Sequence, residues 1–195
     1  MKGFILGHGR SGTMWVAKAL RACTDLDARH ESMRKELGPD FGGVESNGNL
    51  CRFAKQIPEA YPGARVIHQV RDGRDVVRSV MTKKERKGRT LRQACERWVL
   101  INQRLMVDIG QCNRYRLEDL ISIQGSFETL ALSLRAWSFN GQAWEEVRIR
   151  PMNQSRVHTF PPYEDWKPEE QEMFWEICGE TMGRLGYADR EGYLT

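Results

Sequence analysis

The chain has 195 residues, of which 40% are hydrophobic and 29% charged, and its formal net charge is +4. This composition is typical of one globular domain, expected over residues 1–195, and it argues against global disorder, collagen and a coiled coil. No apolar run approaches the ~20 residues that a membrane span needs, and Phe4–Leu6 is too short for a signal-peptide core. We therefore expect neither a membrane span nor export.

The five cysteines and four histidines are scattered along the sequence. They form no CxxC pair, no HExxH motif and no Cys/His cluster, so we expect free thiols and no structural zinc. Free thiols are typical of a reducing compartment, which predicts a cytoplasmic protein.

The first third of the chain alternates strand and helix patterns. A short buried strand is expected over Gly3–Gly7, a helix over Thr13–Ala22 and a second strand over Leu26–His30. Residues Met33–Gly48 are rich in Gly, Asp and Asn and are expected to form a covering loop.

Next come a capped helix and the clearest strand. Ser46 or Asn47 is expected to cap a helix that runs to about Ile57. The strand is expected over Ala64–Val70, and a helix is expected to start near Asp75.

The second half is mainly helical. The strongest amphipathic pattern covers Leu91–Ile109, and a short strand is expected over Asn113–Leu117. Helices are also expected over Phe127–Phe139 and Glu169–Leu185, the latter with Pro168 at its first turn. Strands that alternate with helices predict a parallel sheet with helical crossovers.

The motif with the clearest chemistry is Gly7–Thr13, which lies between the first strand and the first helix. Glycines allow backbone N–H groups to converge on an anion, and the following helix N-terminus adds partial positive charge. The spacing G-x-x-x-x-G-T is that of a Walker A loop without its lysine, and Arg10 is the only cation within it. The alternative is a tight Gly-rich turn.

A second motif, Arg71–Asp75 with Ser79, begins where the clearest strand ends. In open α/β sheets ligands bind at that end of the strands. Arg71 is suited to a phosphate, whereas Asp72 and Arg74 are expected to be structural. The alternative is an Arg/Asp ion-pair cluster that caps the helix, with Asp75 as the cap.

Together these motifs resemble those of sulfotransferases that use 3′-phosphoadenylyl sulfate (PAPS). Gly9–Thr13 with Trp15 resembles the family's 5′-phosphosulfate loop, and Val70–Val77 with Ser79 resembles its 3′-phosphate motif. Weaker landmarks of the family are matched at Trp98–Asn102, Tyr115–Leu120 and from Trp166 to Tyr187. The resemblance spans nearly the whole chain and implies a three-layer P-loop-like α/β fold with a central, mainly parallel sheet flanked by helices.

The resemblance implies transfer of a sulfuryl group from PAPS to a hydroxyl or an amine, which leaves 3′,5′-adenosine bisphosphate (PAP), without a metal. Ser155 and Arg156 would make a late nucleotide contact, or Arg156 is a solvated loop residue. The residues expected to bind the cosubstrate are His8, Gly9, Arg10, Ser11, Gly12, Thr13, Met14, Arg71, Ser79, Ser155 and Arg156.

Two catalytic roles follow. Arg10 is expected to neutralise charge on the leaving phosphate. A hydroxyl acceptor needs a general base, and Glu31 is favoured because similar bacterial sulfotransferases often have a His-Glu pair here. His30 is the second candidate and Glu45 the third; each is otherwise a surface or hydrogen-bonded polar residue.

The segment Thr82–Arg92 carries six basic residues and one acid. It is interpreted as a solvated face, or else as a flap that attracts an anionic acceptor or closes over nucleotide. Nucleic-acid binding is not favoured, because interleaved aromatic residues are absent.

Two other functions remain open. A small P-loop kinase would depend on ATP and Mg²⁺, and the missing Walker lysine argues against it. A non-catalytic nucleotide-binding module would keep the phosphate contacts but lack a base. The sequence leaves open whether the acceptor is a small molecule, a carbohydrate, a lipid or a peptide, and leaves the oligomeric state open too.

Overall fold

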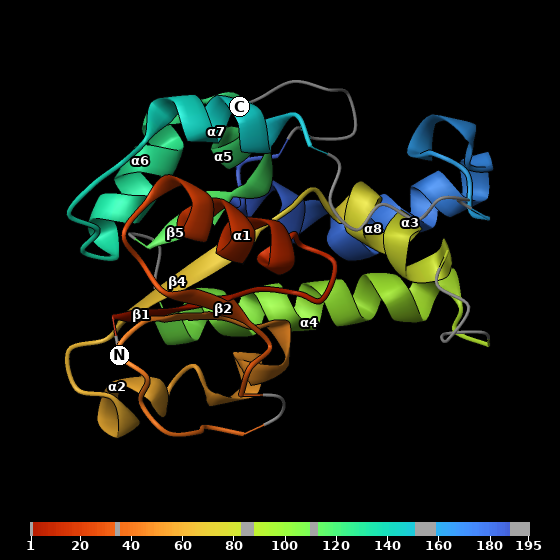
Figure 1. Cartoon of the computed structure of the whole chain (residues 1–195). Coiled ribbons are helices and arrows are strands. Elements are labelled where there is room, and N and C mark those ends of the chain that lie inside the picture. Colours follow the sequence, from red (N-terminus) through yellow and green to blue (C-terminus); the bar gives the residue numbers. More distant parts are fainter. Residues whose placement is uncertain (1, 34–35, 83–87, 110–112, 151–158, 188–195) are drawn as a thin grey trace. The chain divides into compact units, whose positions relative to one another are not determined.

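The structure is a computed structural model that describes residues 2–33, 36–82, 88–109, 113–150 and 159–187 (Figure 1). The chain divides into two compact units. The sheet unit comprises residues 1–70 and 105–154, and the helical unit comprises residues 71–104 and 155–195. One boundary between the units falls directly after a strand and another falls within a long helix. That one domain spans residues 1–195 stays a prediction.

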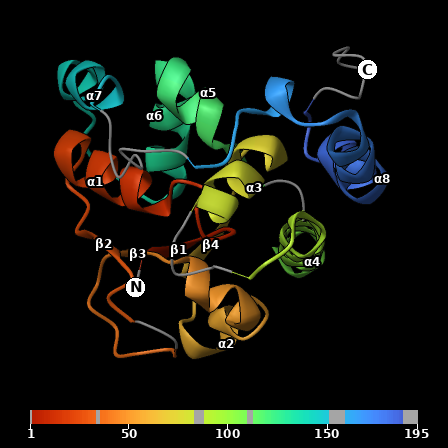
Figure 2. The same cartoon turned by 90° about the vertical axis from the view of Figure 1, so that its right-hand side faces the viewer.

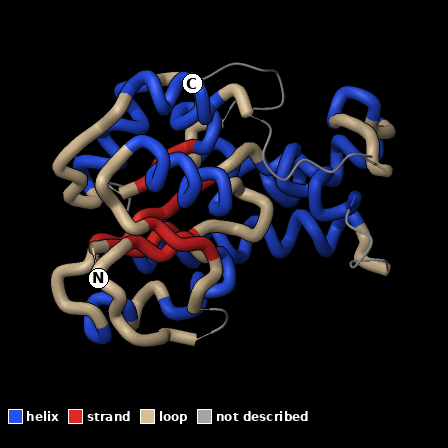
Figure 3. Tube along the Cα trace, viewed as in Figure 1, coloured by secondary structure: helices blue, strands red, loops and turns tan. Residues whose placement is uncertain are grey.

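Five parallel strands form the centre of the sheet unit, in the order β2-β3-β1-β4-β5 (Figure 3). In the register, Ile5 pairs with Ser46 and Leu6 pairs with His68, so the carboxyl ends of β1, β3 and β4 share one edge. This confirms the expected α/β fold with a parallel central sheet. The strands are β1 (Gly3–Leu6), β2 (Ala28–His30), β3 (Val44–Ser46), β4 (Arg65–Val70) and β5 (Arg114–Arg116).

Helices cover both faces of this sheet (Figure 2). Helices α1, α5, α6 and α7 lie on one face, and α2 lies on the other. The core under α1 is continuous, with Trp15 in edge-to-face contact with Phe127 and Trp144 also buried. The helical elements are α1 (Thr13–Cys23), the 3₁₀-helix η1 (Gly48–Phe53), α2 (Ile57–Ala60), α5 (Leu117–Ser122), α6 (Gln124–Ser133) and α7 (Gly141–Arg148).

Three sequence predictions in this unit were wrong. The loop expected over residues 33–48 contains β3, whose polar residues Glu45 and Ser46 are buried and therefore hid the strand from a hydropathy pattern. The helix capped by Asn47 is a 3₁₀-helix that ends at Phe53. The helix expected to reach residue 139 ends at Ser133, and α7 follows it.

The helical unit contains α3 (Gly73–Thr82), most of α4 (Leu91–Ile109), the 3₁₀-helix η3 (Tyr163–Asp165) and α8 (Pro168–Arg184). The predictions for α4 and α8 are confirmed to within one residue. A Cβ on Gly73 would lie 3.1 Å from both Trp98 and Met182, so the start of α3 packs tightly in this core. Two buried thiols, Cys95 and Cys178, also meet there, and their contact together with burial raises the pKa of Cys178.

No helix in the described part of the chain has the length and apolar character that crossing a membrane requires.

Candidate functional site

The loop between β1 and α1 requires glycine at two positions. A Cβ on Gly7 would lie 2.4 Å from the carbonyl oxygen of Gln69 and 2.6 Å from Ser11 Oγ. Gly12 has φ of 91°, and a Cβ there would lie 2.6 Å from a methyl group of Leu117. Any larger residue at either position would displace the loop from β4 or from α5.

The conformation of this loop suits an anion. It closes through a bond from Ser11 N to the carbonyl of His8 (2.9 Å), and Arg10 takes φ of 88°, which is rare for a side-chain-bearing residue. Helix α1 begins at Thr13 directly after the loop, and the first N–H groups of a helix have no intrahelical acceptor. The arrangement therefore places the first backbone N–H groups of α1 beside the loop, whose cationic residue is Arg10.

Two residues that the sequence assigned to the loop are buried. His8 is 2% exposed, and because a carbonyl only accepts, its Nδ1 donates to the carbonyl of Gly9 at 2.5 Å. Ser11 is 1% exposed, and its Oγ has no hydrogen-bond partner among the described residues. His8 thus stabilises the loop from its buried side. The Ser11 hydroxyl is a buried hydrogen-bonding group that has no partner among the described residues.

Neighbouring strands hold the loop in place. Gln69 Nε2 of β4 donates to the carbonyl of Ser11, and Ser46 Oγ of β3 donates to the carbonyl of Thr13, each at 2.8 Å. Both Gln69 and Ser46 are fully buried. These two bonds fix carbonyl groups of the loop on the sheet side.

Sequence reasoning did not find Ser46 or Gln69 as supports of the loop. Gln69 and His68 are polar residues within the buried part of β4, and this was a usable signal for Gln69. Ser46 had no such signal, because its strand was itself missed.

His30 and Glu31 lie at the end of β2, next to β3. The His30 Nδ1 is 2.9 Å from the carbonyl oxygen of Ser46. Since a carbonyl only accepts, Nδ1 carries the proton, and the neutral imidazole then has its lone pair on Nε2. The Glu31 Oε1 is 3.9 Å from that Nε2. The pair is therefore an imidazole oriented by the backbone with a carboxylate beside it.

The two side chains differ in exposure. The Glu31 side chain is 47% exposed and that of His30 is 19% exposed. Glu31 has φ of 53°, and its N–H also bonds to the carbonyl of Ser46. Ser46 therefore links the pair to the Gly7–Thr13 loop. Its carbonyl accepts bonds from His30 and Glu31, and its hydroxyl donates to the loop.

Glu45, the third candidate base, is enclosed. It is fully buried, and its carboxylate accepts bonds from Ser32 Oγ (2.5 Å), Asn47 Nδ2 (2.9 Å) and Met33 N (3.4 Å). Burial, helped by the negative charges of Asp40 and Glu45, raises the pKa of Tyr61. Glu45 therefore braces the chain that follows Glu31.

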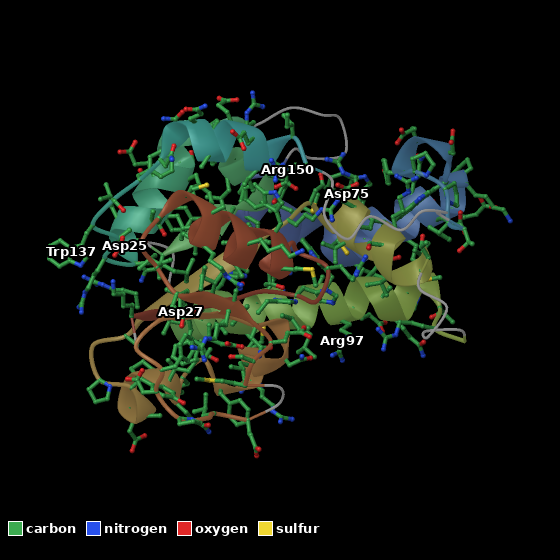
Figure 4. All side chains as sticks on the ribbon, viewed as in Figure 1. Asp25, Asp27, Asp75, Arg97, Trp137 and Arg150 are labelled. Atoms are coloured by element: carbon green, nitrogen blue, oxygen red, sulfur yellow. The ribbon has the colours of Figure 1, made fainter. Side chains whose placement is uncertain are left out.

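Arg71 and Ser79 belong to the helical unit. Arg71 follows the last residue of β4 in the chain, and its Nη2 lies 2.8 Å from Oδ2 of Asp75, which is labelled in Figure 4. The Arg71 side chain is 29% exposed, whereas Ser79 is 7% exposed on α3. The Arg71 guanidinium is therefore paired with Asp75 and partly exposed to solvent.

Asp72 and Arg74 are structural, as expected. Asp72 accepts from the N–H of Arg74 (2.8 Å) and pairs with its guanidinium, and this pairing raises the pKa of Arg74. Arg74 also stacks over Tyr163. The helix begins at Gly73, so the cap is Asp72 and the expectation that Asp75 would cap it was wrong.

Ser155, Arg156 and residues 83–87 of the basic segment lie outside the described residues. Within the described ranges, no three His, Cys, Asp or Glu side chains converge as a metal site would need.

Comparison with known proteins gives matches among solved structures. The mouse sulfotransferase SULT7A1 in complex with PAP superposes with a TM-score of 0.53 at 12% identity, over 93% of this chain and 84% of that one. A sulfotransferase from Alicyclobacillus acidocaldarius superposes with a TM-score of 0.57 at 14% identity, over 94% and 93%. The chain has the sulfotransferase fold. No family model and no curated protein matches the sequence. The two matches cover 93% and 94% of this chain.

Proposed function

We propose that the protein is a PAPS-dependent sulfotransferase that acts on a hydroxyl acceptor. The observation that carries this proposal is the Gly7–Thr13 loop, an anion cradle at the start of α1 in a sulfotransferase fold, with Arg10 as its cation instead of a Walker lysine. The PAP-bound structure of mouse SULT7A1, a fold neighbour, supports the choice of nucleotide.

In the proposed reaction, the acceptor oxygen forms a bond to the sulfur of PAPS while the bond between sulfur and the phosphate oxygen breaks. PAP leaves with the extra negative charge, and the acceptor proton goes to a base. The loop N–H groups and Arg10 stabilise the charge on the 5′-phosphate, as in phosphoryl transfer. Thr13 and Met14 contribute the first N–H groups of α1.

We assign the base to His30 and a supporting role to Glu31. The carbonyl of Ser46 fixes the proton on Nδ1 and leaves Nε2 to accept the proton of the hydroxyl. Glu31, at 3.9 Å, stabilises the imidazolium that forms. This assignment reverses the order expected from sequence, where Glu31 came first.

Arg71 and Ser79 are proposed to bind the 3′-phosphate, which distinguishes PAPS from ATP. Arg71→Ala is then expected to weaken PAP binding by about 1.5–3 kcal/mol, or roughly ten- to a hundredfold, since a charged hydrogen-bond partner is lost. Binding of 5′-AMP, which lacks that phosphate, is expected to change little. Calorimetry with both ligands on both proteins gives the comparison.

Arg74→Ala is the matched control. It removes the same charge two residues after the cap, but Arg74 is paired with Asp72 and stacked over Tyr163. It is expected to lower stability and to affect PAP and AMP alike. If Arg71→Ala also weakens both ligands equally, Arg71 is structural and the 3′-phosphate assignment fails.

A further inference from the structure

A groove with a cavity volume of about 390 Å³ lies along the first turns of α4, within the helical unit. The groove's lining residues that belong to α4 recur at helical spacing, so they share one face of that helix. Figure 4 shows Arg97 extending from this helix. The residues that line the groove are Arg89, Gln93, Glu96, Arg97 and Leu100.

The start of α4 is fixed by reciprocal bonds. Thr90 N donates to Gln93 Oε1 (3.1 Å), and Gln93 N donates to Thr90 Oγ1 (3.2 Å). Because Oε1 of Gln93 is used in this cap, its amide NH₂ remains as a donor on the groove side. Arg89 directly precedes the cap and is partly buried.

The Nη1 atom of Arg89 is buried and has no hydrogen-bond partner in the described part of the chain. A buried donor without an acceptor is unfavourable, more so on a charged group. Arg97 also lines the groove, and within the described ranges it forms no ion pair. One acid, Glu96, faces the same space, so the lining residues within the described ranges carry two positive charges and one negative charge.

Leu100 is 66% exposed at the far end of the groove. The groove is shallow and open to solvent, because Gln93, Glu96, Arg97 and Leu100 are all exposed and only Arg89 is partly buried. The groove therefore has cations and an amide at one end and an aliphatic side chain at the other. This distribution is complementary to an anion that has an apolar body.

We propose that this groove binds the phosphate, sulfate or carboxylate group of an amphipathic small molecule. Arg89 and Arg97 bind the anionic oxygens, Gln93 donates a hydrogen bond, and Leu100 contacts the apolar part. None of these residues belongs to the phosphate loop, the His30–Glu31 pair or the 3′-phosphate motif, so the site does not depend on the proposed reaction.

Phenyl phosphate and inorganic phosphate are suitable probes, followed by the amide NMR signals of the intact chain. Saturable shifts at Arg89–Leu100 report the groove, whereas shifts at Gly9–Met14 report the phosphate loop, so the two sites are read separately. Phenyl sulfate and benzoate then identify which anionic group binds best.

Arg89→Ala is expected to weaken phenyl phosphate at the groove about tenfold or more, because a charge-assisted bond is lost. Glu96→Gln is expected to tighten it about two- to fivefold by removing a like charge. Leu100→Ala is expected to weaken phenyl phosphate but not inorganic phosphate.

Arg92→Ala is the control, since Arg92 carries the same charge but its guanidinium lies 4.0 Å from Glu176 of α8 and does not line the groove. It is expected to leave binding unchanged. Each variant is accepted only if its remaining amide spectrum matches that of the wild type. The proposal is overturned if the groove amides do not shift with any probe, or if Arg92→Ala weakens binding as much as Arg89→Ala, which would indicate diffuse charge attraction only.

Discussion

His30→Asn is expected to lower the rate of sulfuryl transfer by about 10²–10⁴-fold, the usual contribution of a general base. The asparagine amide is able to keep the bond to the Ser46 carbonyl that His30 makes at 2.9 Å, so the local structure is retained while the basic nitrogen is lost. PAP affinity is expected to stay unchanged. The measurement is steady-state transfer to an acceptor identified by screening acceptor pools with labelled PAPS.

Glu31→Gln is the paired variant that decides between the two candidate bases. If Glu31 only supports the imidazolium, across 3.9 Å and with a half-exposed carboxylate, its loss is worth about 0.2–1 kcal/mol, or roughly a 1.4- to 5-fold lower rate. The opposite pattern, with Glu31→Gln inactive and His30→Asn active, would return the role of base to Glu31. Activity in both variants would remove this pair from the chemistry.

Arg10→Gly is expected to lower the transfer rate by about 10²–10³-fold, because it removes the loop's cation from the place where charge develops on the leaving phosphate. Glycine suits the backbone at this position, where φ is 88°, so the free energy of unfolding is expected to hold or to rise. Transfer kinetics and denaturant unfolding of the same protein separate the two effects.

Arg10→Lys is the control for charge. It is expected to recover part of the rate, since an ammonium supplies the charge without the forked donors of a guanidinium. If Arg10→Gly transfers at the wild-type rate, the loop's backbone alone stabilises the leaving group and Arg10 has no catalytic role.

The elements with strong local signals were predictable from the sequence. The turn at Gly7–Thr13 follows from its glycines between an apolar strand and a helix, and α4 follows from nineteen residues of amphipathic periodicity. The ends of β4 and α1 were placed within one residue for the same reason.

The features that the sequence did not reveal depend on contacts between distant residues. The strand β3 has three residues, two of them polar, and is stabilised by pairing with β1 and β2 on either side. Without β3, the Ser46 carbonyl that lies beside His30 was not visible, and Glu31 was ranked first because similar bacterial sulfotransferases often have a His-Glu pair there. Glu45 could not be separated from the other candidates, because only the fold shows that its carboxylate is enclosed by Ser32 and Asn47.

The central claim is that the protein binds a 3′-phosphorylated adenosine nucleotide for sulfuryl transfer, and thermal unfolding with PAP in EDTA tests it most directly. A ligand that binds only the folded state stabilises it by about 2.7 kcal/mol at a hundred times its dissociation constant. We expect PAP to raise the melting temperature without metal, and ATP with Mg²⁺ to raise it less. An unchanged melting temperature at saturating PAP, together with an increase caused by ATP and Mg²⁺, would contradict the sulfotransferase assignment and favour a kinase.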